Sequence, residues 1–127
     1  MISISRIDHI VLTVKNIPAT IDFYVRVLGM RADTFADNRV ALKFGQQKIN
    51  LHQAGKEFEP KAKNATPGSA DLCLITDTDL TQAIKHVQNC KVEIIEGPVE
   101  RTGANGKLLS FYIRDPDQNL IEIANKF

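Results

Sequence analysis

The chain has 127 residues, enough for one compact domain with a hydrophobic core of its own. Sixteen Lys and Arg residues nearly balance 15 Asp and Glu residues, so the charge favours neither nucleic acid nor an anionic membrane as a partner. No apolar run approaches the ~20 residues that span a bilayer, and the N-terminus lacks a signal-peptide cleavage pattern. Cys73 and Cys90 are the only cysteines, without CxxC spacing, which predicts buried, reduced thiols in a cytoplasmic protein.

The first half of the chain predicts a strand, a helix and three further strands. Residues 7–14, IDHIVLTV, form a short apolar run rich in β-branched side chains, as strands do. Pro18 suits the first turn of a helix, and Gly29 suits its C-terminal cap. The apolar face of this helix is predicted to contain Ile21, Tyr24, Val25 and Leu28. The following strands are predicted at 31–35, 39–44 and 48–53.

The second half repeats this order. Residues 71–76, DLCLIT, predict a strand, and the chain then carries an amphipathic helical pattern behind an Asp/Thr cap region. The apolar positions of that helix are Leu80, Ala83, Ile84 and Val87. His86 lies on the same helix and is expected to face solvent. Three more strands are predicted at 92–96, 108–114 and 120–124. We therefore expect one domain with modules at about 5–53 and 70–126, joined by a loop at about 54–69.

Aligning the two halves at a spacing of about 60 residues pairs polar residues in equivalent strands. His9 falls opposite Asp71, and Asn50 falls opposite Glu122. Because side chains alternate between the two faces of a strand, these residues lie on faces opposite the apolar packing positions.

The carboxylate of Glu122 stands out because it interrupts the apolar strand Leu-Ile-Glu-Ile. A buried carboxylate needs a cation, a proton or strong donors. Taken singly, a strand histidine is commonly a satisfied core or surface residue, and a strand glutamate commonly lies on the wet side of a sheet. The pairing of the four polar positions by the internal repeat favours a functional role.

Four segments carry a family resemblance that covers essentially the whole chain: IDHIVLTV, TIDFYVRVLGM, SADLCLIT and RDPDQNLIEI. Together they resemble the vicinal oxygen chelate superfamily, which includes glyoxalase I, bleomycin and fosfomycin resistance proteins, and extradiol dioxygenases. KINLHQAGKEFEPKA and EGPVERTGANGK are similar to a lactoylglutathione-lyase-like glyoxalase-domain branch. The resemblance implies an α+β fold in which two βαβββ modules form a half-open, mostly antiparallel barrel.

The resemblance also implies one divalent metal ion, bound at the positions of His9, Asn50, Asp71 and Glu122. Asn50 and Asp71 depart from the family pattern, which has His or Glu at the first position and His at the second. His52 lies two residues beyond Asn50 on the same face and could restore an imidazole. The predicted ligands are therefore His9, His52, Asp71 and Glu122, with Glu122 and Asp71 as catalytic groups. The closing turn departs as well, since Gln118 replaces a glycine expected at positive φ.

The function implied by the resemblance is a glyoxalase-type lyase or isomerase that acts on a small oxygenated or thiol-adduct substrate. The metal, which could be Ni, Zn, Mn or Fe(II), would stabilise an oxyanion or enediolate. Two alternatives stay open: a metal-free drug- or metabolite-sequestering protein of the bleomycin-resistance type, and an Fe(II) extradiol dioxygenase. Further pocket residues are predicted to be Asn50, Arg101, Tyr112 and Arg114. The expected partners are a small-molecule substrate and a second copy in a homodimer, with no nucleic acid or membrane.

Overall fold

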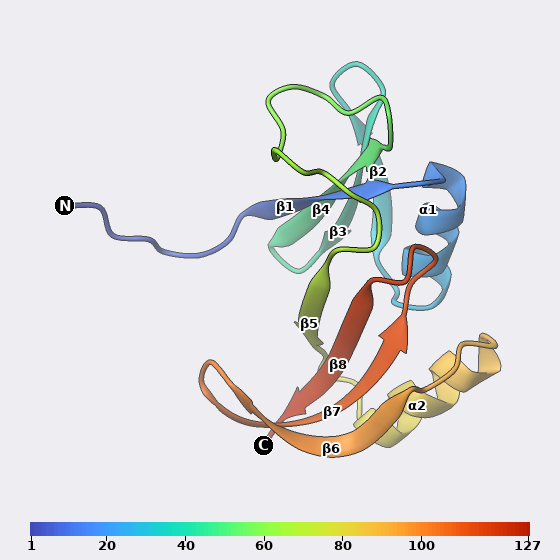
Figure 1. Cartoon of the computed structure of the whole chain (residues 1–127). Helices are drawn as coiled ribbons and strands as arrows, with labels where there is room; N and C mark the ends of the chain where they lie inside the picture. Colours follow the sequence, from blue (N-terminus) through green and yellow to red (C-terminus); the bar gives the residue numbers. More distant parts are fainter. The chain divides into compact units, whose positions relative to one another are not determined.

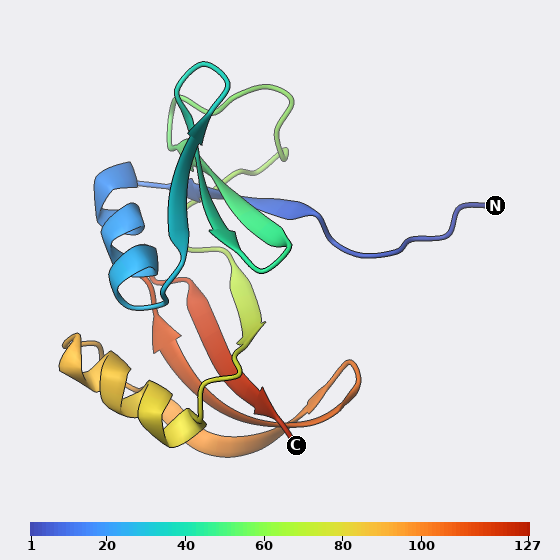
Figure 2. The same cartoon turned by 180° about the vertical axis from the view of Figure 1, so that it is seen from behind.

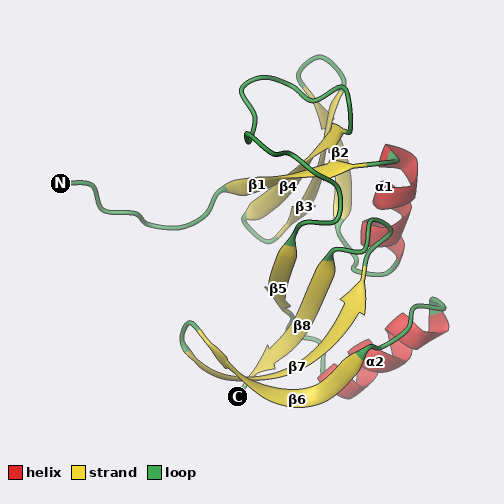
Figure 3. Ribbon diagram, in the orientation of Figure 1, coloured by secondary structure: helices red, strands yellow, loops and turns green.

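The computed structural model describes all 127 residues. Its internal contacts divide the chain into unit 1, Met1–Pro67, and unit 2, Gly68–Phe127. Each unit consists of one helix and one open four-stranded sheet with both parallel and antiparallel pairs (Figures 1 and 3). This arrangement confirms the prediction of an α+β fold built from two βαβββ modules.

Unit 1 contains sheet A, whose strand order is β1-β4-β3-β2. Its elements are β1 (His9–Val14), α1 (Ile17–Arg26), β2 (Arg31–Phe35), β3 (Arg39–Phe44) and β4 (Gln47–Gln53). β1 pairs with β4 in parallel, and the other pairs are antiparallel. The chain before β1 runs as an extended segment (Figure 1).

Helix α1 begins and ends as the sequence predicts, but its buried face differs. The side chain of Asn16 caps the N-terminus by accepting a hydrogen bond from the backbone N–H of Ala19 at 2.9 Å. Gly29 follows the helix at φ +70°. The buried helix positions and their C-terminal neighbour are Thr20, Phe23, Tyr24 and Val27. The predicted face was wrong at Val25, which is exposed, because two overlapping apolar stripes share Tyr24 and the sequence does not rank them.

The core of unit 1 lies on one face of sheet A. The buried apolar strand residues on this face are Leu12, Val14, Leu42, Ile49 and Leu51. Strand alternation therefore places His9, Asn50 and His52 on the opposite face. We call that opposite face the polar face of sheet A; it also carries Phe35, Arg39 and Lys48.

Unit 2 contains sheet B, whose strand order is β5-β8-β7-β6. Its elements are β5 (Asp71–Ile75), α2 (Leu80–Asn89), β6 (Glu96–Gly103), β7 (Gly106–Arg114) and β8 (Leu120–Lys126). β5 pairs with β8 in parallel, and the other pairs are antiparallel. Asp79 caps α2 by accepting from the N–H of Thr81 at 3.2 Å. The buried apolar residues of sheet B include Phe111, Ile113, Ile121 and Ile123, and the face opposite them is the polar face of sheet B.

The strand predicted at 92–96 was misplaced, because β6 begins only at Glu96. Glycine and proline are disfavoured inside a strand. Gly97 and Pro98 nevertheless belong to β6, because the pairing register shifts between Glu96 and Val99. Gly97 has φ +111°, and an added Cβ would lie 2.5 Å from the carbonyl oxygen of Ser110. Glycine is therefore required at this irregularity.

Candidate functional site

The four polar positions paired by the repeat occupy equivalent places in the two sheets. In sheet A, Asn50 lies opposite Val11, two residues after His9. In sheet B, Glu122 lies opposite Cys73, two residues after Asp71. Each polar face thus carries one residue of the first strand and one residue of the last strand of its module as diagonal neighbours.

His9 stands at the start of β1 beside a carboxylate. Its ring nitrogen Nδ1 lies 2.9 Å from Oδ2 of Asp8, and its side chain is 45% exposed. Hydrogen bonding of one ring nitrogen to a carboxylate fixes the orientation of the imidazole and leaves Nε2 for another partner. Metal-bound histidines commonly have this arrangement.

Asn50 is buried in the middle of β4 with an unsatisfied acceptor. The residue is 6% exposed, and its Oδ1 atom has no hydrogen-bond partner. A buried acceptor without a donor is costly. The side chain lies on the polar face, so a cation or a donor supplied there would satisfy it.

His52 is almost fully buried, at 3% exposure, and contacts a cation. Its Nε2 atom lies 3.3 Å from Nη2 of Arg39; because a guanidinium can only donate, Nε2 accepts this bond. Burial and then the charge of Arg39 lower the pKa of His52, while Glu57 opposes the shift. The neutral form of the imidazole is therefore favoured, and its Nε2 atom already accepts a hydrogen bond from Arg39.

The connecting segment is anchored at the same place. The ring of Phe58 meets His52 edge-on at a centroid distance of 5.3 Å. Arg39 lies 4.5 Å from the centroid of Phe58 and 5.4 Å from that of Phe35. Arg39 was missed by the sequence analysis, although its strand parity relative to His52 could have placed it on the polar face.

Glu122 lies in the middle of β8 and is held by a buried serine. The hydroxyl of Ser110, which is fully buried on β7, donates to Oε2 of Glu122 at 2.7 Å. This bond orients the carboxylate and leaves Oε1 without a contact to Ser110. Ser110 was also missed, because a lone serine in an apolar strand gives no distinctive signal.

Cys73 lies directly across from Glu122 and is exposed on the polar face, so the prediction that it is a buried core thiol was wrong. Desolvation, together with the charge and hydrogen bond of Glu122, raises the pKa of Cys73 to about 11. Cys90 is half-buried, and its sulfur lies 3.7 Å from Nε2 of His86, which is exposed as predicted.

Two predicted pocket residues contact each other on sheet B. Tyr112 lies opposite Glu122 on β7, and its hydroxyl accepts a hydrogen bond from Nε of Arg101 at 2.8 Å. Arg101 also forms an ion pair with Glu96 at 2.6 Å. Arg114 is exposed and donates to the carbonyl oxygen of Gln118 at 3.3 Å.

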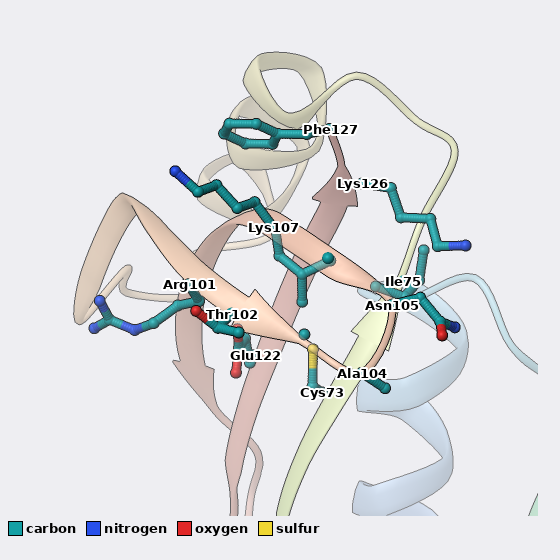
Figure 4. A pocket seen from close by; sticks show the side chains of 13 residues that line it. Cys73, Ile75, Arg101, Thr102, Ala104, Asn105, Lys107, Glu122, Lys126 and Phe127 are labelled. Atoms are coloured by element: carbon teal, nitrogen blue, oxygen red, sulfur yellow. The ribbon is translucent and has the colours of Figure 1, made fainter.

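A cavity of about 600 Å³ opens on the polar face of sheet B within unit 2. Figure 4 shows Cys73 and Glu122 near the centre of its lining, with Arg101 extending to one side and Lys126 to the other. The size lies in the middle of the range for small-molecule sites. The cavity combines a thiol and a carboxylate with apolar and cationic walls.

The DPDQN turn positions β8 and hence Glu122. The carboxylate of Asp115, 2% exposed, accepts from the backbone N–H groups of Asp117 and Asn119 and from the Asn119 amide at 2.8–3.0 Å. Asn119 in turn accepts from the N–H of Ala70 at 2.8 Å, just before β5. Gln118 has φ +71°, as its place in the motif predicts. The aspartate that opens the motif is therefore structural.

The residues present suit a divalent metal by their chemistry. An imidazole with a carboxylate on its far nitrogen, an unsatisfied amide oxygen and two strand carboxylates are ordinary ligands. Within either unit, however, no three His, Cys, Asp or Glu side chains are grouped closely enough to hold an ion. Unit 1 brings His9, Asn50 and His52 to one face, and unit 2 brings Asp71 and Glu122 to another.

Neither helix has the length and apolar character needed to cross a membrane.

Sequence comparison gives the family. Residues 6–123 match the model of the Glyoxalase/Bleomycin resistance protein/Dioxygenase superfamily. The chain is 60% identical over 121 residues to virulence protein STM3117 of Salmonella typhimurium, covering 95% of this chain and 84% of that protein. It is 52% identical over 124 residues to the glyoxalase domain-containing protein RDO1 of Mycosarcoma maydis, covering 98% of this chain and 70% of that protein.

Solved structures similar to this chain support the same family assignment. Integron cassette protein VCH_CASS1, from the mobile metagenome of V. cholerae, is 60% identical with a TM-score of 0.98, covering 100% of this chain and 99% of that one. Lactoylglutathione lyase from Agrobacterium tumefaciens, 21% identical with a TM-score of 0.74 over 97% of this chain and 95% of that one, shares the fold. The chain therefore belongs to the glyoxalase/bleomycin resistance protein/dioxygenase superfamily, as the sequence motifs indicated.

Proposed function

We propose that the chain is a divalent-metal-dependent lyase or isomerase of the glyoxalase type, acting on a small oxygenated or thiol-adduct substrate. One observation carries the proposal: Asn50 and Glu122 have the same register relative to His9 and Asp71 in the two modules. Members of this superfamily commonly use a divalent metal ion. A repeat that conserved only packing would not need polar side chains at these positions.

The proposed ligands are His9 through Nε2 and the carboxylates of Asp71 and Glu122. For a fourth ligand, the contacts favour Asn50 over His52, because Oδ1 of Asn50 lacks a partner whereas Nε2 of His52 accepts from Arg39. A bound Ni, Zn, Mn or Fe(II) ion would act as a Lewis acid on adjacent substrate oxygens.

The chain's own contribution to the reaction is proton transfer. Ser110 holds Oε2 of Glu122, so we assign proton transfer to Oε1. For a hemithioacetal, this oxygen would take the proton from the carbon that bears the sulfur and return it to the neighbouring carbon. The product is a 2-hydroxy thioester, and no oxidant is consumed. Asp71 is the second carboxylate of the same polar face and could relay the proton.

The test is a lyase assay on protein reconstituted separately with each of the four metals. Hemithioacetals made from an α-ketoaldehyde and a panel of thiols are offered, and thioester formation is followed by ultraviolet absorbance. We expect turnover with at least one metal and thiol, and its loss in Glu122→Gln. Absence of turnover with every metal-loaded form would contradict the proposal.

A second candidate function is sequestration of a drug or metabolite without chemistry. It is favoured by the 600 Å³ cavity together with Asn50 and Asp71, which depart from the usual ligand types. TnmS3 from a Streptomyces species, an antibiotic binding protein that is 22% identical with a TM-score of 0.77 over 100% of both chains, shares the fold. A ligand that binds equally well with and without chelator, and is recovered unchanged, would support this alternative over the lyase.

We further propose that the chain acts as a homodimer, with a small molecule as its ligand. The repeat divides the proposed ligands between two modules, and a symmetric pair of chains is the commonest assembly of small proteins. Light scattering should give a mass near twice 14.2 kDa. A monomer at micromolar concentration would contradict the dimer.

A further inference from the structure

Three cations stand in a row across adjacent strands of sheet A. Arg31 on β2 lies directly opposite Lys43 on β3, and Lys43 lies directly opposite Lys48 on β4. The three strands run side by side in the teal-to-green part of the chain (Figure 2). Like charges placed directly opposite each other destabilise a sheet. A nearby anion would reduce this repulsion and stabilise the sheet.

Within unit 1, only one of the three cations in this row has a carboxylate as its ion-pair partner. Asp33 forms an ion pair with Lys43 at 3.5 Å, whereas neither Arg31 nor Lys48 has a carboxylate within 4.0 Å. Arg31 and Lys48 therefore have no ion-pair partner in the structure. The ammonium of Lys48 lies 3.9 Å from the ring centroid of Phe35, a contact that fixes its position without neutralising its charge.

The three cations line one hollow. It has a volume of about 330 Å³ and is also lined by Gly45 and Gln46 of the β3–β4 turn. This size is at the small end of the range for ligand sites. Arg6 adds a further cation near the turn, where it donates to the carbonyl oxygen of Gln46 at 3.3 Å.

One carboxylate, that of Asp8, also lines the hollow. It is turned towards Nδ1 of His9, and this hydrogen bond is the main cause of its lowered pKa. Asp8 forms no ion pair with Arg31, Lys43 or Lys48, so its charge offsets the row only from a distance.

We propose that this hollow binds the phosphate group of a small molecule through Arg31, Lys43 and Lys48. Arg31 and Lys48, which have no ion-pair partner, would supply positive charge to a phosphate ester, which carries about −1.5 to −2 at neutral pH. Lysine ammonium groups bind such groups as point charges, and arginine binds them through paired N–H donors. The volume of the hollow, about 330 Å³, suits a small ligand, and the net charge of the chain, +1, adds little long-range attraction for nucleic acid. The proposal names an anionic ligand class and does not depend on the metal.

The test uses chelator-treated full-length protein and inorganic phosphate as the probe. Amide shifts are followed by NMR at constant ionic strength, with chloride as the replaced anion. We expect saturable shifts at Gly45, Gln46 and Lys48, and binding weakened about fivefold or more in Lys48→Gln and in Arg31→Gln. Lys85→Gln, which removes an exposed charge from α2, is the matched control and should bind as the wild type does.

A second readout separates binding from folding. In phosphate-free buffer Arg31→Gln should melt no lower than the wild type, because a repulsion is removed. Added phosphate should raise the melting temperature of the wild type more than that of the variant. The proposal is overturned if phosphate shifts lysine amides throughout the chain alike, or if Lys48→Gln and Lys85→Gln bind phosphate equally. Tighter binding of a single-stranded oligonucleotide than of phosphate would overturn the small-ligand assignment. None of these outcomes decides whether the protein catalyses the proposed lyase reaction, because the test measures phosphate binding and not turnover.

Discussion

Ser110 donates a hydrogen bond of 2.7 Å to Oε2 of Glu122 from the adjacent strand of sheet B. The serine is fully buried and the glutamate is partly exposed, and strand alternation puts both side chains on the polar face of sheet B. Oε2 is thereby fixed, and the orientation of the whole carboxylate follows from it.

Ser110→Ala should weaken both folding and metal binding. Loss of a hydrogen bond to a charged group lowers the free energy of unfolding by about 1–2 kcal/mol. Loss of an outer contact to a ligand lowers metal affinity by roughly 10-fold. Denaturant unfolding and metal titration measure the two effects. Ser5→Ala, at an exposed position, is the control, and equal metal affinity in the two variants would argue that Ser110 does not orient Glu122.

The buried imidazole of His52 predicts a loss of stability in acid. Burial and Arg39 hold its pKa below the ordinary value of 6.5, so the unfolded chain takes up the proton at a higher pH than the folded chain does. The free energy of unfolding should therefore be unaffected by this group above about pH 6.5 and should fall as the pH drops below it. This pH dependence is measured by urea unfolding between pH 5 and 8, in steps of roughly one pH unit and with chelator present.

His52→Gln should flatten that part of the pH profile, because glutamine does not titrate. His86→Gln removes an exposed histidine from α2 and should leave the slope in place. If the free energy of unfolding of the wild type does not fall below about pH 6.5, or if only His86→Gln changes this fall, His52 is not its cause.

Cys73 should react slowly despite its exposure. A pKa near 11 leaves little thiolate at pH 8, and the thiolate is the nucleophile. Alkylation by iodoacetamide, read at Cys73 by mass spectrometry, should be at least ~10-fold slower in the folded than in the unfolded protein. Glu122→Gln removes the negative charge that raises this pKa, so it should speed the reaction. Glu93→Gln serves as the control; if it speeds alkylation equally, Glu122 is not the cause.

The strands and their faces could be predicted because alternation and β-branched residues act locally. β2 and β3 begin and end at the predicted residues, and the faces of Asn50 and Glu122 follow from parity alone. β6 could not be placed, because the irregularity at Gly97 depends on its close approach to the backbone of β7 across the hairpin, which local propensity does not reveal.

The candidate site was harder to predict than the fold. Parity put His52 on the polar face but could not show that Arg39 from β3 and Phe58 from the connecting segment enclose it. Cys73 is small and apolar enough to be taken for a core residue, although alternation from Asp71, two residues before it, places it on the polar face beside Glu122. The enclosure of His52, by contrast, depends on contacts between segments distant in the sequence, which a single sequence does not encode locally.

The proposed function requires that His9 and Glu122 hold a divalent metal ion. The most direct measurement is elemental analysis of the protein purified without chelator and after incubation with Ni, Zn, Mn or Fe(II), for the wild type and for three variants. We predict about one ion per chain in the wild type and in the control His86→Ala, and loss of that ion in His9→Ala and in Glu122→Gln. A wild-type protein that is isolated without metal and takes up none of the four ions would contradict the account.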